Sequence, residues 1–282
     1  MGLTRRDALK VAVLGGAAVA LPLERSVAGV SLYPNRIAES ALPAPFTVPF
    51  TIPPVIKPVR SDLTTDYYHV SMAPTVVEML PGYKTPMWAY NGSVPGPTFR
   101  CTQGRKAVVR QVNNLPATHP TLNDTPRTSV HLHGQASLPE YDGYASDITN
   151  PGQWKDYRYP NWQPARSLWY HHDNGLHHTA ENVYMGLAGQ YHLIDWREQS
   201  LPIPHGEFEV PLIVSDKMFT ADGGLLFDTN DTAGLYGDVI TVNGRPWPVM
   251  KVKRRKYRFR ILNASVSRSY NWSLDNGATM TV

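Results

Sequence analysis

The sequence predicts an all-β protein built as a Greek-key β-sandwich. Short runs that alternate apolar and polar residues recur from about residue 67 onward, and turn signals rich in Gly, Pro and Asn separate them. The chain contains 25 prolines, 21 glycines and 15 tyrosines, a composition that favours strands and turns. No long segment shows helical periodicity. Short strands at regular spacing with such punctuation are typical of a Greek-key sandwich.

The first 28 residues read as an export signal rather than as part of the fold. Arg5 and Arg6 form a twin-arginine pattern, and an apolar run follows from Val11 to Leu21. This run is short for a membrane span, so we expect no stable membrane anchor. A twin-arginine signal implies a protein that is exported already folded, to the periplasm or the extracellular space.

Residues 29–60 form a Pro-rich segment, which we expect to be an extended arm because proline is incompatible with a helix interior. Its apolar residues alternate, which predicts that the arm lies along the sandwich. These residues are Phe46, Val48, Phe50 and Ile52.

Residues 61–195 are predicted to form a first complete domain, and residues 134–163 within it a long connection. The expected strands of this domain are 67–72, 75–79, 87–90, 107–112, 129–133, 167–170 and 190–194, with one short helix at 179–185. Residues 196–207 are expected to be a linker. A second β unit, 208–282, has expected strands at 208–214, 238–242 and 257–262, and it stops inside an apparent strand. We therefore expect this second domain to be incomplete.

Charge and cysteine content exclude some classes of function. The net charge of +4 is small, and its one dense basic run is residues 251–260. There Arg258 and Arg260 alternate with apolar residues, which predicts a half-buried strand with a solvated basic face rather than a nucleic-acid site. The single cysteine, Cys101, excludes an internal disulfide and is expected to be a buried, inert thiol.

The most informative motif is a strand-like run with two histidines, His131 and His133, which alternate with Val130 and Leu132. Strand periodicity places both imidazoles on one face, about 6.6 Å apart along the chain. That spacing suits two neighbouring metal ions better than one. Neutral imidazole is a good ligand for Cu, Zn, Fe or Ni. The alternative is a pair of strand histidines that face water.

A second histidine cluster favours the metal hypothesis. It contains His171 and His172, followed by Asp173 and Asn174, and then by the pair His177-His178. A metal site requires the two clusters to meet in the folded chain.

At this level of detail the sequence resembles the multicopper oxidases, most closely the branch of bilirubin oxidases and spore-coat laccases. The resemblance runs from about Pro43 to the end, and many segments fall in the family's order. They are NGSVPGPTF (91–99), SVHLHG (129–134), YDG (141–143), SLWYH (167–171), TAEN (179–182), GLAG (186–189) and GDVITVNGRPWP (237–248).

The resemblance implies three cupredoxin-like domains, a type-1 copper that takes electrons from a small-molecule reductant, and a trinuclear type-2/type-3 copper centre that reduces dioxygen to water. By this resemblance His131 binds the type-2 copper and His133 a type-3 copper. Asp142 matches a carboxylate beside the type-2 water, where it relays protons. The alternative for Asp142 is a turn residue before Gly143.

The second ligand pair departs from the family pattern, which reads Trp-Tyr-His-Asp-His. One extra residue is present here, so the partner two positions on is Asp173 if His171 is in register, or Asn174 if His172 is. On a regular strand the two adjacent histidines point to opposite faces, and only a β-bulge brings both to one site. We therefore keep His171, His172 and Asn174 as candidate ligands. Asp173, His177 or His178 is the alternative replacement.

The family's C-terminal copper motifs are absent from residues 1–282. The resemblance therefore implies the N-terminal part of an oxidase for phenolic, aromatic amine or tetrapyrrole substrates. Such a part needs a C-terminal cupredoxin domain to complete its copper site, and we expect it to be inactive alone. The alternative is a non-catalytic cupredoxin-like protein that binds copper or acts as a structural remnant.

Overall fold

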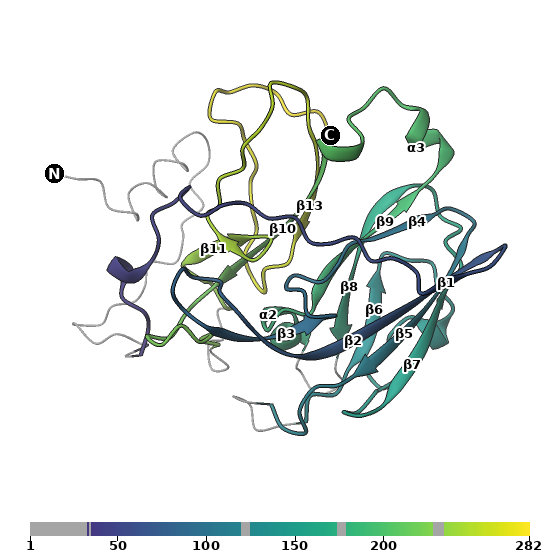
Figure 1. The fold of residues 1–282 in the computed structure, drawn as a ribbon, viewed down its shortest axis with the longest axis horizontal. Helices are drawn as coiled ribbons and strands as arrows, with labels where there is room; N and C mark the ends of the chain where they lie inside the picture. The colour runs from purple at the N-terminus through teal and green to yellow at the C-terminus, as the bar shows by residue number, and fades with distance from the viewer. Residues whose placement is uncertain (1–32, 34, 120–124, 174–178, 228–233) are drawn as a thin grey trace. The chain divides into compact units, whose positions relative to one another are not determined.

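The computed structural model describes residues 33, 35–119, 125–173, 179–227 and 234–282. The chain divides into two compact units, Met1–Asn35 and Arg36–Val282, and the description below concerns the second (Figure 1). The predicted export segment, Asn174, His177 and His178 lie outside the described residues.

The first sheet carries the longest strand of the chain. Its order is β1-β2-β5-β7, and β3 pairs with the other end of β2. The pairs β2·β5 are parallel, whereas β5·β7 and β2·β3 are antiparallel. Two predicted strands, 67–72 and 75–79, prove to be the single strand β2. The members are β1 (Arg60–Ser61), β2 (Thr65–Val77), β3 (Thr85–Tyr90), β5 (Lys106–Asn113) and β7 (Trp154–Tyr159).

Strand β7 corrects the prediction that residues 134–163 are only a connection. Its aromatic residues Tyr157 and Tyr159 are buried, whereas Arg158 between them is exposed. Three charged residues mask this alternation in the sequence, but the register of β7 against β5 buries both tyrosines.

The second sheet has the order β4-β9-β8-β6 and carries both histidine motifs. It packs on the first sheet through a core that includes Tyr68, Trp88, Leu132, Tyr157 and Tyr191. This packing, with mixed parallel and antiparallel pairs, confirms the predicted sandwich. The strands are β4 (Phe99–Thr102), β6 (Ser129–His133), β8 (Arg166–Asp173) and β9 (Ala188–Ile194).

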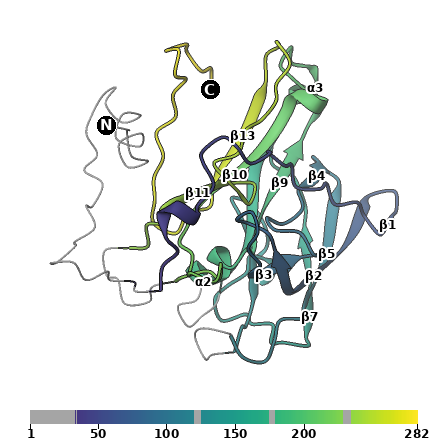
Figure 2. The same cartoon turned by 60° about the vertical axis from the view of Figure 1, so that its left-hand side comes forward.

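A third sheet, β12-β11-β10-β13, follows in the sequence. Val183 of helix α2 packs against Ile213 of β10, and Figure 2 shows this helix close to the third sheet. The strands are β10 (Glu209–Lys217), β11 (Val239–Val242), β12 (Arg245–Pro246) and β13 (Arg258–Asn263), and α2 is Thr179–Tyr184. Among the described residues, no helix is both long and apolar enough to cross a membrane.

The predicted linker 196–207 contains regular structure. Helix α3 (Trp196–Ser200) begins where the Asp195 carboxylate accepts a hydrogen bond from the Glu198 backbone N–H, an ordinary N-cap. A 3₁₀ turn, η3 (Gly206–Phe208), precedes β10, and two others, η1 (Glu39–Ala41) and η2 (Pro139–Tyr141), lie earlier. The boundary between the first and second predicted domains stays a prediction, because both fall within one compact unit.

The described part of the Pro-rich arm, residues 35–60, is largely extended apart from η1 and makes backbone hydrogen bonds with two other segments. The Phe50 N–H donates to the Val249 carbonyl at 3.0 Å, and the Ile56 N–H donates to the Thr98 carbonyl at 3.0 Å. The arm therefore ties residues of the third sheet region to the second sheet.

Strand β13 overturns the prediction of a solvated basic face. Arg260 is 5% exposed, whereas Phe259 and Ile261 are 45% and 40% exposed. The Arg260 guanidinium donates hydrogen bonds to Glu209 of β10 at 2.5 Å and to Glu198 of α3 at 2.6 Å. These two carboxylates compensate the buried charge, so the basic face is the covered one.

Cys101 is 4% exposed, as predicted for a structural thiol. Burial raises its pKa to about 11, although hydrogen bonds with Tyr191 and Tyr68 act in the opposite direction. A thiol with this pKa is almost entirely protonated at neutral pH and therefore a poor nucleophile or metal ligand.

Candidate metal centre

The register between β6 and β8 brings the two histidine motifs together. The strands are antiparallel, with His131 opposite His171, His133 opposite Trp169 and Ser129 opposite Asp173. Residues directly opposite each other in a sheet share a face. Both strands therefore contribute to one row of polar and aromatic side chains, and the intervening residues Leu132 and Tyr170 face the core.

Three imidazoles converge on this face. The ring centroids of His131 and His133 are 5.4 Å apart, those of His131 and His171 are 5.4 Å apart, and those of His133 and His171 are 5.9 Å apart. One nitrogen from each ring lies within 4.8 Å of the other two. Three nitrogen donors at this separation fit a site for one or more transition-metal ions.

His131 is held by the loop that follows η2. Its Nδ1 lies 2.5 Å from the backbone carbonyl of Asp142, so Nδ1 carries the proton and Nε2 is the atom left to bind a metal. The carboxylate of Asp142 lies 3.8 Å from the same Nδ1 and accepts a hydrogen bond from the Ser137 hydroxyl at 3.3 Å. Asp142 therefore lies beside the predicted ligand, at the end of a turn.

Gly143 makes this close approach possible. Its φ is +86°, and a Cβ at this position would lie 2.1 Å from the carbonyl oxygen of Val130. Only glycine combines that conformation with such a close backbone approach. The loop can therefore reach β6 and place the Asp142 carbonyl on His131.

His171 is the most buried of the three, at 5% exposed. Neither of its ring nitrogens has a hydrogen bond of good geometry, although the Asp173 carboxylate lies 3.3 Å from Nδ1. Buried polar atoms normally have a hydrogen-bond partner, so these nitrogens are available to a metal ion or a water molecule. Together with the convergence of the three rings, this makes the described residues fit a metal site.

The surroundings of His133 favour its neutral form, which is the form that binds metal. Burial lowers the pKa of His133, and the neighbouring His131 and His171 lower it further. Since metals bind neutral imidazole, a lowered pKa favours binding at neutral pH.

The structure does not bring His172 to this face. Pairing is continuous along β8 to Asp173, so the bulge that would have joined both adjacent histidines is absent from this strand. His172 is fully buried on the core face and stacks on Tyr90, with ring centroids 5.4 Å apart. Burial lowers its pKa to about 3, so it stays neutral in the core. The hypothesis that His172 is a ligand is therefore at odds with its placement, and Asn174 lies outside the described residues.

Two residues of the site were not found by sequence reasoning. Trp169 stacks on His133 with ring centroids 5.4 Å apart, and its ring lies 4.1 Å from that of His171. Gly143 supports His131 as described above. The signal for Trp169 was present, because it lies two residues before His171 and so shares its face. No local pattern signals the contact between Gly143 and Val130.

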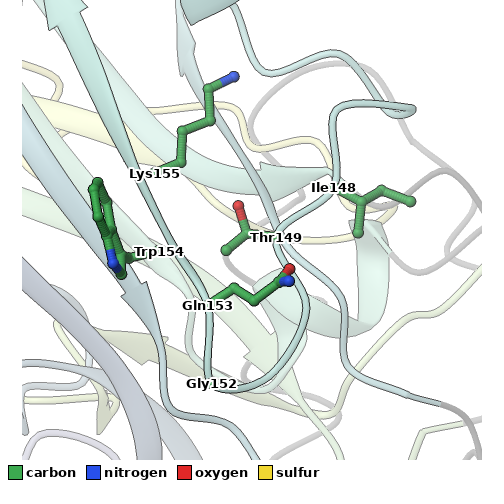
Figure 3. A pocket seen from close by; sticks show the side chains of 6 residues that line it. All are labelled: Ile148, Thr149, Gly152, Gln153, Trp154 and Lys155. Atoms are coloured by element: carbon green, nitrogen blue, oxygen red, sulfur yellow. The ribbon is translucent and has the colours of Figure 1, made fainter.

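A surface hollow of this chain is separate from the cluster. It has a volume of about 480 Å³ and is lined by Ile148, Thr149, Gly152, Gln153, Trp154 and Lys155 (Figure 3). None of the converging histidines lines it.

Comparison with known proteins agrees with this geometry. Residues 71–197 match a family model described as multicopper oxidase. Bilirubin oxidase from Albifimbria verrucaria is 46% identical over 207 residues, which cover 72% of this chain and 34% of that protein. A laccase from Bacillus subtilis is 37% identical over 247 residues, which cover 75% of this chain and 48% of that protein.

Solved structures give the same result. The crystal structure of a multi-copper oxidase from Pediococcus acidilactici superposes with a TM-score of 0.71 at 30% identity, over 79% of this chain and 46% of that one. The chain thus spans about a third to a half of the length of the relatives described here. The sandwich is cupredoxin-like, as expected, and the chain belongs to the multicopper oxidase family, whose members are copper-binding oxidoreductases.

Proposed function

We propose that this chain supplies part of the ligands of a trinuclear copper centre in a laccase-like or bilirubin-oxidase-like enzyme. The observation that carries the proposal is the convergence of His131, His133 and His171 from two adjacent strands. The enzyme would couple one-electron oxidation of phenolic, aromatic amine or tetrapyrrole substrates to the reduction of dioxygen to water. Copper, when bound, would supply the redox chemistry.

The residues of this chain would orient the copper ligands and supply protons to the site. The carbonyl of Asp142 keeps the proton of His131 on Nδ1, which leaves Nε2 available to a metal. The Asp142 side chain is 35% exposed, so it has access both to solvent and to the face that carries the imidazoles. A carboxylate in this position can pass protons from water towards the site.

Turnover would require further copper ligands from another domain. Residues 1–282 contain neither a His-Cys-His run nor a second His-x-His pair. We propose that a C-terminal cupredoxin domain completes the copper centre and carries the substrate-facing copper. We also propose that the protein is exported through the twin-arginine pattern at residues 5 and 6.

The test is copper binding and oxidase activity of the purified chain. We expect the chain to bind copper and His131→Ala to lose tight binding, whereas His69→Ala on an exposed position of β2 leaves it unchanged. We expect no oxidation of a laccase dye by the copper-loaded chain alone. Dye oxidation by that chain would contradict the need for a second domain. Copper binding by His131→Ala as tight as that of the wild type would contradict the proposed copper site. Failure of the wild-type chain to bind copper would favour the non-catalytic structural alternative.

A further inference from the structure

Asp173 occupies a position that needs its own explanation. In the register set by Trp169 and Tyr170, it stands two residues after His171, where a further metal ligand was expected. It lies on the same face of β8 as His171 and opposite Ser129 of β6. Two roles are open to a carboxylate here: it binds a metal ion itself, or it orients the histidine that does.

The contacts of Asp173 point to the second role. Its Oδ1 lies 3.3 Å from Nδ1 of His171 and accepts a hydrogen bond from the Thr179 hydroxyl at 3.2 Å. Thr179 is the first residue of α2, so the carboxylate is fixed between a strand and a helix. An oxygen that contacts both groups lies at Nδ1 of His171, on the opposite side of the ring from a metal bound at Nε2.

The two ring nitrogens of His171 have different surroundings. Nδ1 has a carboxylate oxygen within reach, whereas Nε2 is buried without a partner. The carboxylate 3.3 Å away favours a proton on Nδ1, although the contact falls short of good hydrogen-bond geometry. Nε2 is then the one atom of this imidazole left for a metal.

Trp169 limits the remaining motion of the ring. It lies on the opposite side of His171 from Asp173 along the strand, with ring centroids 4.1 Å apart and an interplanar angle of 31°. His171 is therefore confined between an aromatic surface and an anchored carboxylate. His131 has the equivalent support, because Nδ1 contacts the Asp142 carbonyl. Each of these two imidazoles is thus left with Nε2 as the nitrogen that can bind a metal.

We propose that Asp173 is a positioning residue that accepts the Nδ1 proton of His171, and that it is not a metal ligand. Metal-bound histidines commonly donate their second N–H to a carboxylate or a carbonyl, which fixes the tautomer and raises the basicity of the ligand. The inference rests on the proposed copper site, which it deepens by giving this residue a role.

The first test uses the metal-free chain and measures the tautomer of His171 by ¹⁵N NMR of histidine-labelled protein. We expect the Nδ1-protonated form in the wild type and a mixture of both tautomers in Asp173→Ala. Thr179→Val, which removes the hydroxyl that anchors the carboxylate, should give an intermediate result. An Nε2-protonated His171 in the wild type, or an unchanged tautomer in Asp173→Ala, would overturn the inference.

The second test measures copper binding by chelator competition and the Cu(II) EPR spectrum at saturation. Loss of a carboxylate that supports a ligand typically lowers metal affinity about 10- to 100-fold. We expect this loss in Asp173→Ala, smaller loss in Asp173→Asn, and none in Asp156→Ala, a similarly exposed aspartate paired with Arg110 on the other sheet. At saturating copper the EPR parameters of Asp173→Ala should equal those of the wild type.

The outcomes separate this inference from the proposed function. A changed EPR spectrum in Asp173→Ala would show that the carboxylate is a ligand and would overturn the positioning role alone. A wild-type chain that binds no copper would instead overturn the copper site. The tautomer measurement needs no metal, so it decides the role of Asp173 in either case.

Discussion

Strands β6 and β13 have the same alternation of apolar and polar residues, yet they bury opposite faces. In β6, Val130 and Leu132 are 2% and 1% exposed, and the histidines between and beyond them face the candidate metal site. In β13, Arg260 is buried while Phe259 and Ile261 are exposed. A period of two shows which side chains share a face, but the neighbouring layer decides which face is covered.

The covering layers differ in their chemistry. The apolar face of β6 meets the aromatic core of the first sandwich, where the Val130 N–H donates to the Tyr157 hydroxyl at 3.0 Å. The basic face of β13 meets Glu209 and Glu198, which accept hydrogen bonds from the arginines. Paired carboxylates therefore let a charged face take the place that an apolar face normally occupies.

The largest expected effect comes from breaking this charge pairing. Glu209→Ala leaves Arg260 without one of its two carboxylates and removes partners from Arg100 and Arg258. Removal of one partner from a buried ion pair typically costs about 3–5 kcal/mol of stability. We expect a loss of this order in the free energy of unfolding, measured by urea denaturation.

The matched control is Glu207→Ala, which removes an exposed pair with Lys253. A loss of only about 0–1 kcal/mol is expected there. Equal losses in the two variants would contradict the view that the buried carboxylates determine which face of β13 is covered.

A smaller effect is expected at the loop that supports β6. Gly143→Ala combines a positive φ with a Cβ that would lie 2.1 Å from the Val130 carbonyl, whereas Gly152→Ala has a similar φ of +82° and open space. The conformation alone costs about 1–2 kcal/mol, and the steric conflict typically adds about 1–3 kcal/mol. We expect Gly143→Ala to be the less stable variant and to bind copper more weakly, as measured by urea denaturation and chelator competition. Identical stability and copper affinity in the two variants would show that the approach of the loop is unimportant.

The smallest expected effect is a pH dependence of stability that arises in β10, the strand beside β13. Lys217 of β10 is 3% exposed and lies over the Tyr184 ring at 4.1 Å. Burial lowers its pKa from 10.5 to about 7, although Asp216 partly opposes the shift. Between these pH values the unfolded chain binds more protons than the native chain, so Lys217 makes stability rise as the pH increases.

We therefore expect the wild type to gain stability between pH 7 and pH 9 relative to Lys217→Met, with urea midpoints as the measurement. Lys106→Met, an exposed lysine on β5, should keep the wild-type dependence. A wild-type slope that survives in Lys217→Met would assign the pH dependence to other groups.

Much of the fold was accessible from local patterns. Alternation identified most strands, and turn residues marked their ends, because strand periodicity and turn geometry depend on a few consecutive residues. The same periodicity placed His131 and His133 on one face and separated His171 from His172. Strand β7 was missed because Lys155, Asp156 and Arg158 hide the alternation of its aromatic residues.

The amino-acid order thus contained the donors of the candidate metal site and the face on which each lies along its own strand. Long-range contacts decided the rest: the pairing of His131 with His171, 40 residues away in the chain, the approach of Gly143 to Val130, and the burial of Arg260. Side-chain direction follows from backbone dihedral angles that neighbouring residues set. Register and burial depend instead on the free energy of contacts between distant segments, which no local pattern contains.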